Sequence, residues 1–243
     1  MPTPLKGQVA LITGGAKGYG AGIAEMLAAA GARVWITGRD PAALRKTAKR
    51  LGVKSLQADA TVPADWDRAI AAITKTAGRL DILVNNAGGG VKIAPAAEQS
   101  DDTIAASIAL NLTAAIYGCR RAAPIMQRQK SGIIVNISSV CSRYSWPGWG
   151  VYGAAKAGLE NFSKSLYLEL RPHGVRVTTV IPSWGATEFG HAANLGPRDA
   201  ATAAKCIQPV ELGKIITDLC ALPPHLCVQE TLVWPTVQEV SPL

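Results

Sequence analysis

The 243-residue sequence is poor in the residues from which metal centres and disulfide frameworks are built. Its three histidines, His173, His191 and His225, lie far apart, and its five cysteines are an odd set without a C-x-x-C pair. This spacing argues against a metal cage and against a network of disulfides. We therefore expect reduced thiols and no bound metal.

Charged residues are also scarce, at 17% of the chain, while apolar residues make up 48%. Glycine and proline are scattered, and no segment is low in complexity. Such a composition excludes disorder, collagen and coiled coil, and it supplies ample material for a core. Because an α/β protein of this length is routinely one domain, we expect a single domain over residues 1–243.

Long uninterrupted apolar runs are missing as well. The first residues, MPTPLKGQ, have no basic start followed by an apolar core, and the most apolar early segment is interrupted by Glu25 and Arg33. A membrane-spanning helix needs ~20 consecutive apolar residues. We therefore expect neither a secretion signal nor a membrane segment, and a cytoplasmic location.

The charge that is present is unbalanced, with 25 Lys and Arg against 17 Asp and Glu, a net charge of +8. The tight basic groups, Arg120–Arg121 and Arg128–Lys130, fall in a segment with the pattern of an amphipathic helix. We interpret them as a solvated helix face and expect no nucleic-acid partner. The basic excess also suits a site for a phosphorylated cofactor.

Strand and helix patterns alternate along the whole chain. Short apolar runs predict strands, and the segments between them have helical patterns. Apolar strands separated by single helices predict an α/β fold with one doubly wound parallel sheet of the Rossmann type and helices on both faces. The predicted strands are 8–13, 33–37, 53–58, 82–86, 133–138, 175–181 and 231–234, and the predicted helices are 20–31, one that begins at 41, 63–77, 101–128, 151–171 and 209–222.

A glycine-rich turn, Thr13-Gly14-Gly15-Ala16-Lys17-Gly18-Tyr19-Gly20, joins the first predicted strand to the first helix. Gly14 permits a tight turn, Gly18 lets the backbone approach a pyrophosphate, and Gly20 allows close contact between helix and strand. The N–H groups and the dipole of the helix N-terminus complete a phosphate site. An ordinary flexible turn is the alternative for a glycine triplet taken alone.

The G-x-x-x-G-x-G spacing of this turn resembles that of the short-chain dehydrogenase/reductase family, and further motifs follow in the family's order. They are Asn85-Asn86-Ala87-Gly88, Asn111, Ser139, the pair Tyr152-x-x-x-Lys156, and the segment from Pro182 to Thr187, in which Ser183 replaces the family's glycine. The resemblance covers nearly the whole chain, and it implies that Asn111, Ser139, Tyr152 and Lys156 are catalytic. It also implies a nicotinamide dinucleotide bound by Gly14, Lys17, Gly18, Tyr19, Gly20, Arg39, Asp59, Ala60, Asn86, Ala87, Gly88, Tyr152, Lys156, Pro182 and Thr187.

The end of the second strand bears on which dinucleotide is bound. An NAD site needs a carboxylate there to accept hydrogen bonds from the ribose 2′-hydroxyl, but the chain has Thr37-Gly38-Arg39. Arg39 can bind a 2′-phosphate through two hydrogen bonds, and Lys17 lies where NADP-preferring family members often carry a second cation. Asp40 is more typical of a helix cap because Pro41 follows it. We therefore predict NADP(H).

Asp59 closes the third strand. It matches the family's adenine-contacting aspartate, and from the sequence it is equally suited to cap a loop.

Tyr152 is the predicted general acid in reduction and the base in oxidation. A phenol with its ordinary pKa of ~10 is a poor proton-transfer group near neutral pH. Lys156 lies one helical turn later on the same face, so its ammonium is expected to lower the pKa of Tyr152. By the resemblance, Lys156 also holds the nicotinamide ribose, and Asn111 orders a water that links Lys156 to solvent. Without the other motifs, Asn111 would be interpreted as a helix cap or kink.

Ser139 follows a strand, where its hydroxyl can donate to the substrate oxygen and stabilise developing charge. Ser138 is the alternative, but the family's spacing of thirteen residues to the tyrosine selects Ser139. No histidine is placed to complete a serine-hydrolase triad. We interpret Cys141, which has no histidine nearby in the sequence, as a packed thiol.

The substrate is expected beyond the carboxyl ends of the strands, where open α/β sheets bind ligands. A loop at about 183–205 borders this region, and its glycines suit a closing lid. Aromatic residues gather there, which indicates an apolar or planar substrate or, alternatively, packing at a subunit contact. The expected substrate residues are Ser139, Tyr144, Trp146, Trp149, Tyr152 and Trp184, and Phe189 lies in the same region.

The leading hypothesis is an NADP(H)-dependent carbonyl reductase that interconverts a secondary alcohol and a ketone or aldehyde. The ending Trp234-Pro235-Thr236-Val237-Gln238 resembles that of NADP-dependent 3-hydroxy acid dehydrogenases of the serine type, which is the first alternative. An epimerase or dehydratase and a non-catalytic dinucleotide sensor on the same fold are further alternatives. The resemblance also implies a homo-oligomer, a tetramer or dimer, and the apolar tail VSPL suits a contact with a neighbouring subunit.

Overall fold

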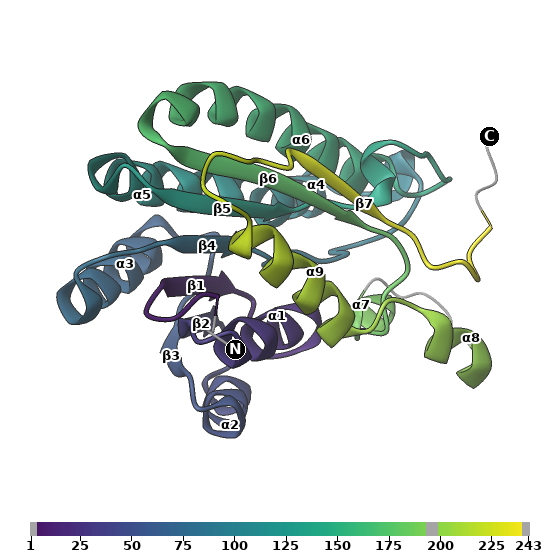
Figure 1. The fold of residues 1–243 in the computed structure, drawn as a ribbon. Helices are drawn as coiled ribbons and strands as arrows, with labels where there is room; N and C mark the ends of the chain where they lie inside the picture. The colour runs from purple at the N-terminus through teal and green to yellow at the C-terminus, as the bar shows by residue number, and fades with distance from the viewer. Residues whose placement is uncertain (1–3, 193–198, 240–243) are drawn as a thin grey trace.

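The structure is a computed structural model that describes residues 4–192 and 199–239. These residues form one parallel sheet that is flanked by helices. Within these residues seven strands pair in the order β3-β2-β1-β4-β5-β6-β7 (Figure 1). The strand order reverses between β1 and β4, which is the place where doubly wound sheets bind ligands. The strands are β1 (Val9–Thr13), β2 (Arg33–Gly38), β3 (Lys54–Gln57), β4 (Ile82–Asn85), β5 (Gly132–Ile137), β6 (Val175–Pro182) and β7 (Glu230–Val233).

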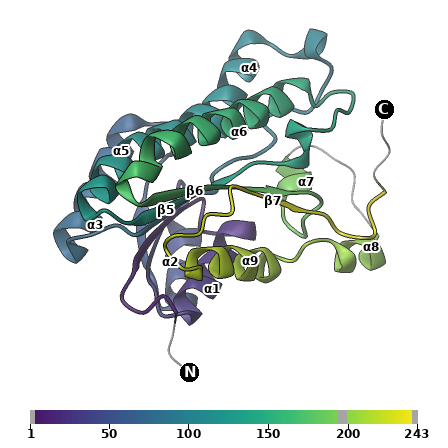
Figure 2. The same cartoon turned by 45° about the horizontal axis from the view of Figure 1, so that its top comes forward.

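Helices cover both faces of the sheet (Figure 2). One face carries α1 (Gly18–Ala29), α2 (Pro41–Leu51) and α9 (Pro209–Ala221). The other carries α3 (Pro63–Ala77), α4 (Asp101–Ile108), α5 (Ala114–Gln129) and α6 (Gly150–Leu170). The predicted doubly wound α/β fold is therefore confirmed.

Each face of the sheet has its own apolar core. Ile23 and Leu27 of α1 pack with Leu212 and Ile216 of α9 against one face. Trp66, Ile73 and Met126 pack with other buried residues against the opposite face. The strands β1, β4 and β5 are buried on both sides, which explains why they appear in the sequence as continuous apolar runs.

Helix α2 begins as its sequence predicts. Asp40 accepts hydrogen bonds from the backbone N–H groups of Ala42 (2.8 Å) and Ala43 (3.1 Å), and Pro41 occupies the first turn. The interpretation of Asp40 as a helix cap is confirmed.

The predicted single helix over 101–128 is interrupted. A π-helical segment, η2 (Ala109–Thr113), separates α4 from α5 and contains Asn111. The run Asp101–Gln129 is long and apolar enough to span a membrane by those two criteria, but α5 packs against β4 and β5 and α4 packs against α6. This apolar run is thus a helical layer of the fold.

The basic residues of α5 are not uniformly solvated. Arg120 and Arg128 are exposed. Arg121 is largely buried instead, because its guanidinium binds the Asp67 carboxylate at 2.7 Å and the Pro63 carbonyl at 3.0 Å. The expectation of a solvated face is wrong for this residue, since α3 packs alongside α5.

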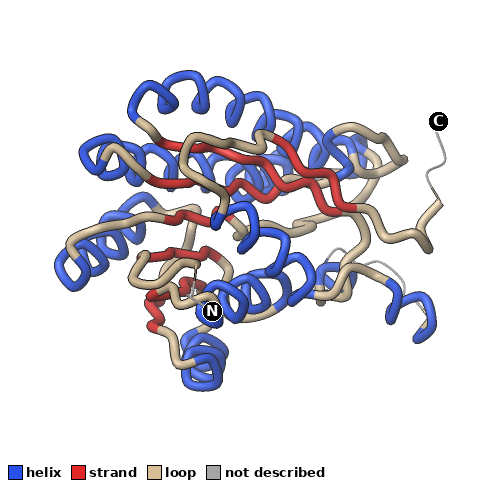
Figure 3. Tube along the Cα trace, in the orientation of Figure 1, coloured by secondary structure: helices blue, strands red, loops and turns tan. Residues whose placement is uncertain are grey.

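The segments after β5, β6 and β7 gather at one end of the sheet (Figure 3). The predicted substrate loop at 183–205 contains two short helices, α7 (Phe189–Ala192) and α8 (Ala200–Lys205). The part 193–198 of this loop, with Gly196-Pro197, and the tail VSPL lie outside the described residues.

Candidate active site

The glycine-rich turn has the geometry of a phosphate site. Gly14 and Gly18 adopt left-handed conformations, with φ of 64° and 52°. A Cβ on Gly20 would lie 2.2 Å from the Gly14 carbonyl oxygen, so the helix approaches the turn too closely for any side chain. Lys17, at the N-cap of α1, provides no side-chain cap, which leaves the first N–H groups of the helix to bind an anion. These features fit the pyrophosphate of a dinucleotide.

The segment after β4 is fixed against this turn. The Asn86 side-chain amide donates to the carbonyls of Thr13 (2.9 Å) and Gly14 (3.2 Å). The backbone N–H of Ala87 donates to the Thr13 hydroxyl at 3.0 Å. Two of the residues expected at the cofactor, Asn86 and Ala87, therefore hold the phosphate turn in place across the switch point of the sheet.

Arg39 lines a cavity of about 450 Å³ at the carboxyl end of β2 and β3. Asp59 lies in the same cavity, and its Oδ1 accepts hydrogen bonds from the Thr61 N–H (2.9 Å) and hydroxyl (2.7 Å). The loop-capping alternative is therefore confirmed, and the adenine contact stays a prediction. The next residue, Ala60, accepts a hydrogen bond from the Trp66 indole at 2.8 Å. The other residues that line the cavity are Gln57, Ala58, Asp65 and Arg68.

Lys17 forms an exposed ion pair with Glu188, which the sequence analysis did not identify. Thr187 lies beside the same turn, since a Cβ on Gly18 would be 3.5 Å from the Thr187 side chain. The segment that follows β6 therefore reaches the phosphate turn. That Lys17 binds a 2′-phosphate stays a prediction, in which the phosphate would compete with Glu188.

Tyr152 and Lys156 lie together near the start of α6, both almost completely buried. The Lys156 Nζ is 5.8 Å from the centre of the Tyr152 ring and donates to the Ile137 carbonyl at 2.8 Å. Their predicted placement on one helical face is confirmed. Because Ile137 ends β5, this bond also joins α6 to the sheet.

The pKa of Tyr152 moves opposite to the prediction. Burial raises it, and a hydrogen bond from Ser139 offsets only part of the rise. Burial also lowers the pKa of Lys156 to about 8, so this amine is still mostly protonated near neutral pH. Near neutral pH the phenol is therefore protonated, which is the form required of a general acid.

Ser139 is the serine that faces Tyr152. Its hydroxyl lies near enough to the phenol to lower the pKa of Tyr152, and it accepts from the Cys141 N–H at 3.3 Å. The alternative, Ser138, donates to Glu160 instead, at 2.9 Å. Burial raises the pKa of the Cys141 thiol, so it is protonated near neutral pH, consistent with a packed thiol.

Asn111 lies in the π-helical turn, a feature that often marks functional positions. Its side-chain amide donates to the carbonyls of Gly89 (2.9 Å) and Ser107 (3.0 Å), and its oxygen accepts from the Gly89 N–H at 3.0 Å. A Cβ on Gly88 would lie 3.1 Å from the Asn111 oxygen and 3.2 Å from the Lys156 Nζ. Gly88 is therefore the small residue between Asn111 and Lys156, and the four predicted catalytic residues are brought together.

Two aromatic side chains surround the Tyr152 phenol. The rings of Trp149 and Phe189 lie 5.6 Å and 5.7 Å from the Tyr152 ring, and they are stacked on each other at 6.2 Å. Phe189 opens α7 in the predicted substrate loop, so this loop reaches Tyr152. The region is lined by apolar rings, as expected.

Tyr144 and Trp146 form a second aromatic group with the end of the chain. The Tyr144 ring lies 5.3 Å from Trp234 and 6.3 Å from Trp146. The Trp234 indole donates to the Gln238 carbonyl at 2.9 Å. The tail after β7 is therefore packed beside the loop after β5.

Gln238 ties this tail to the loop after β6, a role that the sequence analysis missed. Its buried side-chain oxygen accepts hydrogen bonds from the Ser183 hydroxyl (2.5 Å) and the Trp184 N–H (3.2 Å). The available signal was Ser183 itself, which places a hydroxyl where the family has glycine. That hydroxyl needs a partner, and the tail provides it.

A parallel sheet with a glycine turn at its switch point and a Tyr–Lys pair at its carboxyl edge is typical of oxidoreductases that bind a nicotinamide dinucleotide. Residues 8–197 match the short chain dehydrogenase family, and the chain belongs to this short-chain dehydrogenase/reductase family.

Relatives of known activity and known structure agree with this assignment. A 2,3-dihydroxy-2,3-dihydro-p-cumate dehydrogenase of Pseudomonas putida is 38% identical over 191 residues, 76% of this chain and 73% of that protein. A metagenomic short-chain oxidoreductase in complex with NADP is 32% identical with a TM-score of 0.83, covering 97% of this chain and 100% of the other. The closed form of a serine dehydrogenase complexed with NADP⁺ is 28% identical with a TM-score of 0.89, covering 97% and 98%.

Proposed function

We propose that the protein is an NADP(H)-dependent oxidoreductase that interconverts a secondary alcohol and a ketone or aldehyde. The observation that carries the proposal is the convergence of Ser139, Tyr152 and Lys156 at the carboxyl edge of the sheet, next to the glycine turn. A protonated phenol hydrogen-bonded to a serine hydroxyl is the donor pair that a carbonyl oxygen requires during reduction.

Each residue has a distinct task in this chemistry. A bound nicotinamide dinucleotide supplies the hydride to the carbonyl carbon in reduction and accepts it in oxidation. Tyr152 gives its proton to the oxygen of the substrate, and Ser139 donates a hydrogen bond to the same oxygen. Lys156, held by the Ile137 carbonyl, keeps a cationic donor beside the phenol, and Asn111 orders the segment Gly88–Gly89 that separates it from Lys156.

The preference for NADP(H) rests on the second strand. Arg39 lines the cavity at its end, and the carboxylate nearest in sequence, Asp40, caps helix α2 through its Oδ1. Two of the similar solved structures contain NADP or NADP⁺. A guanidinium at this position stabilises a 2′-phosphate and gives no comparable advantage to NADH.

An apolar substrate is favoured by the rings of Trp149 and Phe189 beside Tyr152. The main alternative, a 3-hydroxy acid, is supported by the similarity to serine dehydrogenase and needs a cation for the substrate carboxylate. Arg143 of the loop after β5 is committed to Glu160 and Glu230. We therefore favour an apolar ketone or aldehyde over a hydroxy acid as the substrate.

NADPH consumption against a panel of carbonyl compounds, with wild type and Tyr152→Phe, tests the proposal. The wild type should reduce at least one compound, and Tyr152→Phe should lose about 10²- to 10⁴-fold in kcat while still binding NADPH. Equal rates for both proteins would reject Tyr152 as the acid. Turnover of 3-hydroxy acids with NADP⁺ alone would favour the alternative, and conversion of substrate without net change of the coenzyme would indicate an epimerase or dehydratase.

We also propose a cytoplasmic homo-oligomer, a dimer or tetramer. The apolar run Asp101–Gln129 supports this proposal, because only 33% of its most apolar 18-residue window is buried within the chain. A second copy would cover the remaining apolar surface. Light scattering during size-exclusion chromatography should give a mass of two or four chains, and a mass of one chain would contradict the proposal.

A further inference from the structure

Glu160 is a buried carboxylate that the proposed chemistry does not use. It lies on α6, one turn after Lys156, and is only 6% exposed. Burial of a carboxylate is costly unless hydrogen bonds and positive charge compensate it. The groups that bind the Glu160 carboxylate therefore indicate the role of this side chain.

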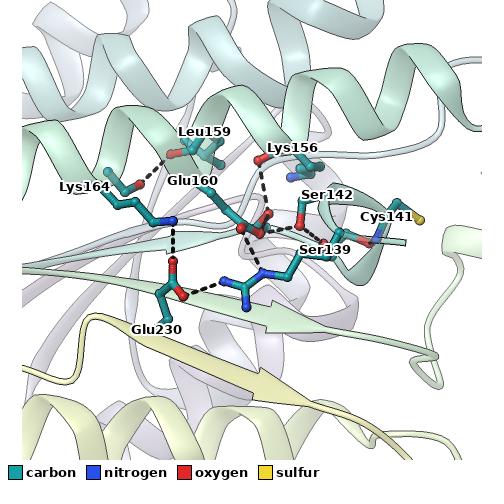
Figure 4. Close-up of polar contacts among 11 residues, drawn as sticks. Ser139, Cys141, Ser142, Lys156, Leu159, Glu160, Lys164 and Glu230 are labelled. Carbon is teal, nitrogen blue, oxygen red and sulfur yellow. Dashed lines mark hydrogen bonds and ion pairs between the residues drawn. The ribbon is translucent and has the colours of Figure 1, made fainter. Parts of the chain in front are cut away.

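Within the described residues, the hydrogen-bond partners of the Glu160 carboxylate come from one short segment that contains Ser139 (Figure 4). Its Oε1 accepts from the Ser138 hydroxyl at 2.9 Å and from the Ser142 hydroxyl. Its Oε2 accepts from the Arg143 Nε at 3.2 Å. One carboxylate thus binds the residue before Ser139 and two residues shortly after it.

The same hydroxyls also contact the catalytic residues. The Ser138 hydroxyl is 3.3 Å from the Lys156 carbonyl oxygen, and the Ser142 hydroxyl is 2.5 Å from the Ser139 carbonyl oxygen. A Cβ on Gly153 would lie 2.6 Å from the Cys141 carbonyl oxygen, so the segment and the helix are in close contact at that point too. Glu160 therefore joins side chains on both sides of Ser139 to the helix of Tyr152.

A second carboxylate extends this cluster toward the surface without reaching Ser139. Glu230 of β7 accepts from the Arg143 guanidinium at 2.5 Å and pairs with Lys164 at 3.1 Å. Both partners are basic side chains, and the Glu230 side chain is about one-third exposed. Glu230 therefore shares Arg143 with Glu160 but has no hydrogen bond to the Ser138 or Ser142 hydroxyl, which makes it a control for the serine contacts of Glu160.

We propose that Glu160 is a positioning residue of the oxidoreductase site, whose carboxylate sets the placement of the Ser139 hydroxyl relative to the Tyr152 phenol. The proposal rests on the proposed function, in which one substrate oxygen accepts from both groups. Ser139 lies on a loop and Tyr152 on a helix, so their separation depends on what fixes the loop to the helix. A misplacement of about 1 Å in such a pair lowers the rate by ~10²-fold.

The test compares Glu160→Ala, Glu160→Gln and Glu230→Gln with wild type, on the carbonyl compound of the panel that wild type reduces fastest. Glu160→Ala should lower kcat by ~30- to 100-fold while the Kd for NADPH stays within about twofold of wild type. The solvent deuterium isotope effect on kcat should rise, because proton transfer from a misaligned phenol becomes slower. Glu160→Gln keeps an acceptor for Ser138 and Ser142 and should recover part of kcat, and Glu230→Gln should match wild type.

A purely structural role gives a different pattern. If Glu160 only stabilises the fold, Glu160→Ala reduces the number of NADPH sites per chain, but kcat per titrated site and the isotope effect stay as in wild type. That result, or an equal loss in Glu230→Gln, overturns the proposal.

Hydrogen–deuterium exchange separates failure of this inference from failure of the proposed function. Residues 139–144 should exchange faster in Glu160→Ala than in Glu230→Gln, with or without turnover. If wild type reduces none of the carbonyl compounds, the proposed function fails and this measurement decides the role of Glu160. Equal exchange of 139–144 in the two variants overturns the positioning role.

Discussion

The coenzyme side of the protein, formed by the ends of β1, β2 and β4, and the substrate side, formed by the segments after β5, β6 and β7, are built differently. On the coenzyme side the contacts involve the backbone of the glycine turn, which Gly14 and Gly20 bring close together and whose carbonyls accept from the Asn86 side-chain amide. On the substrate side they are made by side chains, such as Phe189 against Tyr152 and Gln238 against Ser183.

This difference indicates which side of the protein allows substrate specificity to change without loss of coenzyme binding. Backbone contacts depend on small residues and on strand order, so most side-chain substitutions there damage binding as a whole. Side-chain contacts can be exchanged one at a time, so the substrate side can vary while the coenzyme side is kept. Substitutions on each side should therefore separate coenzyme binding from substrate binding.

The largest effect is expected for Gly20→Ala on the coenzyme side. A Cβ there would lie 2.2 Å from the Gly14 carbonyl oxygen, so the phosphate turn must move. Overpacking of this kind costs about 3 kcal/mol, a ~100-fold weaker Kd for NADPH. Fluorescence titration with NADPH measures this change.

Gly22→Ala is the matched control on the same helix. Its Cβ would collide with Pro209 at 2.2 Å, which strains the packing of α1 on α9 without entering the turn. It should lower the melting temperature and leave the Kd for NADPH nearly unchanged. Equal losses of NADPH affinity in the two variants would show that the turn has no special role.

A smaller and more selective effect is expected for Arg39→Asp. Loss of a charge-assisted pair with the 2′-phosphate should weaken the binding of NADPH by about 2 kcal/mol, which raises its Kd by ~30-fold. NADH, which lacks the phosphate, should bind equally well or better. The ratio of kcat/KM for the two coenzymes measures the shift in preference.

Arg68→Gln serves as the control for charge alone. Arg68 lines the same cavity but is paired with Asp65 at 2.6 Å. It should change the coenzyme ratio far less than Arg39→Asp does. A similar shift for both variants would mean that the 2′-phosphate is attracted by general charge and not bound by Arg39.

On the substrate side, Phe189→Ala should raise KM for an apolar ketone by ~10-fold, since aromatic contacts of this kind contribute up to about 1.4 kcal/mol beyond simple burial. The Kd for NADPH should not change, because the ring faces Tyr152 and Trp149. Phe189→Leu keeps an apolar side chain, so its KM should lie between those of wild type and Phe189→Ala. An unchanged KM in Phe189→Ala would show that this ring does not contact the substrate.

The sequence predicts the coenzyme side well for a physical reason. A turn that needs left-handed glycines and a helix N-terminus is encoded in a few adjacent residues, and strand order then brings Asn86 to it. The Tyr152–Lys156 pair is equally local, because one helical turn separates the two residues. Ser139 needed only the family's spacing, and the structure places it beside Tyr152.

The substrate side was predicted in composition but not in contacts. The aromatic residues were located, yet nothing local indicates that Phe189 reaches Tyr152 or that Glu160 binds the serine segment. The π-helical turn at Asn111 was expected as regular helix, and the pKa of Tyr152 was expected to fall, although burial raises it. Such features depend on how distant segments pack, which no short pattern encodes.

The smallest expected effect tests the most distant of these contacts, that of Gln238 with Ser183, which are 55 positions apart. Gln238→Ala removes the acceptor of both the Ser183 hydroxyl and the Trp184 N–H, so the loop after β6 should loosen and KM for the carbonyl substrate should rise by ~5-fold, about 1 kcal/mol. Ser183→Gly, which restores the residue of the family, removes one of the two bonds and should give a smaller rise. Because the two residues share one hydrogen bond, the double variant should resemble Gln238→Ala, not the sum of the single changes. Strict additivity in KM would show that the tail and the loop act independently, and a rise in the Kd for NADPH would mean that the tail supports the coenzyme side instead.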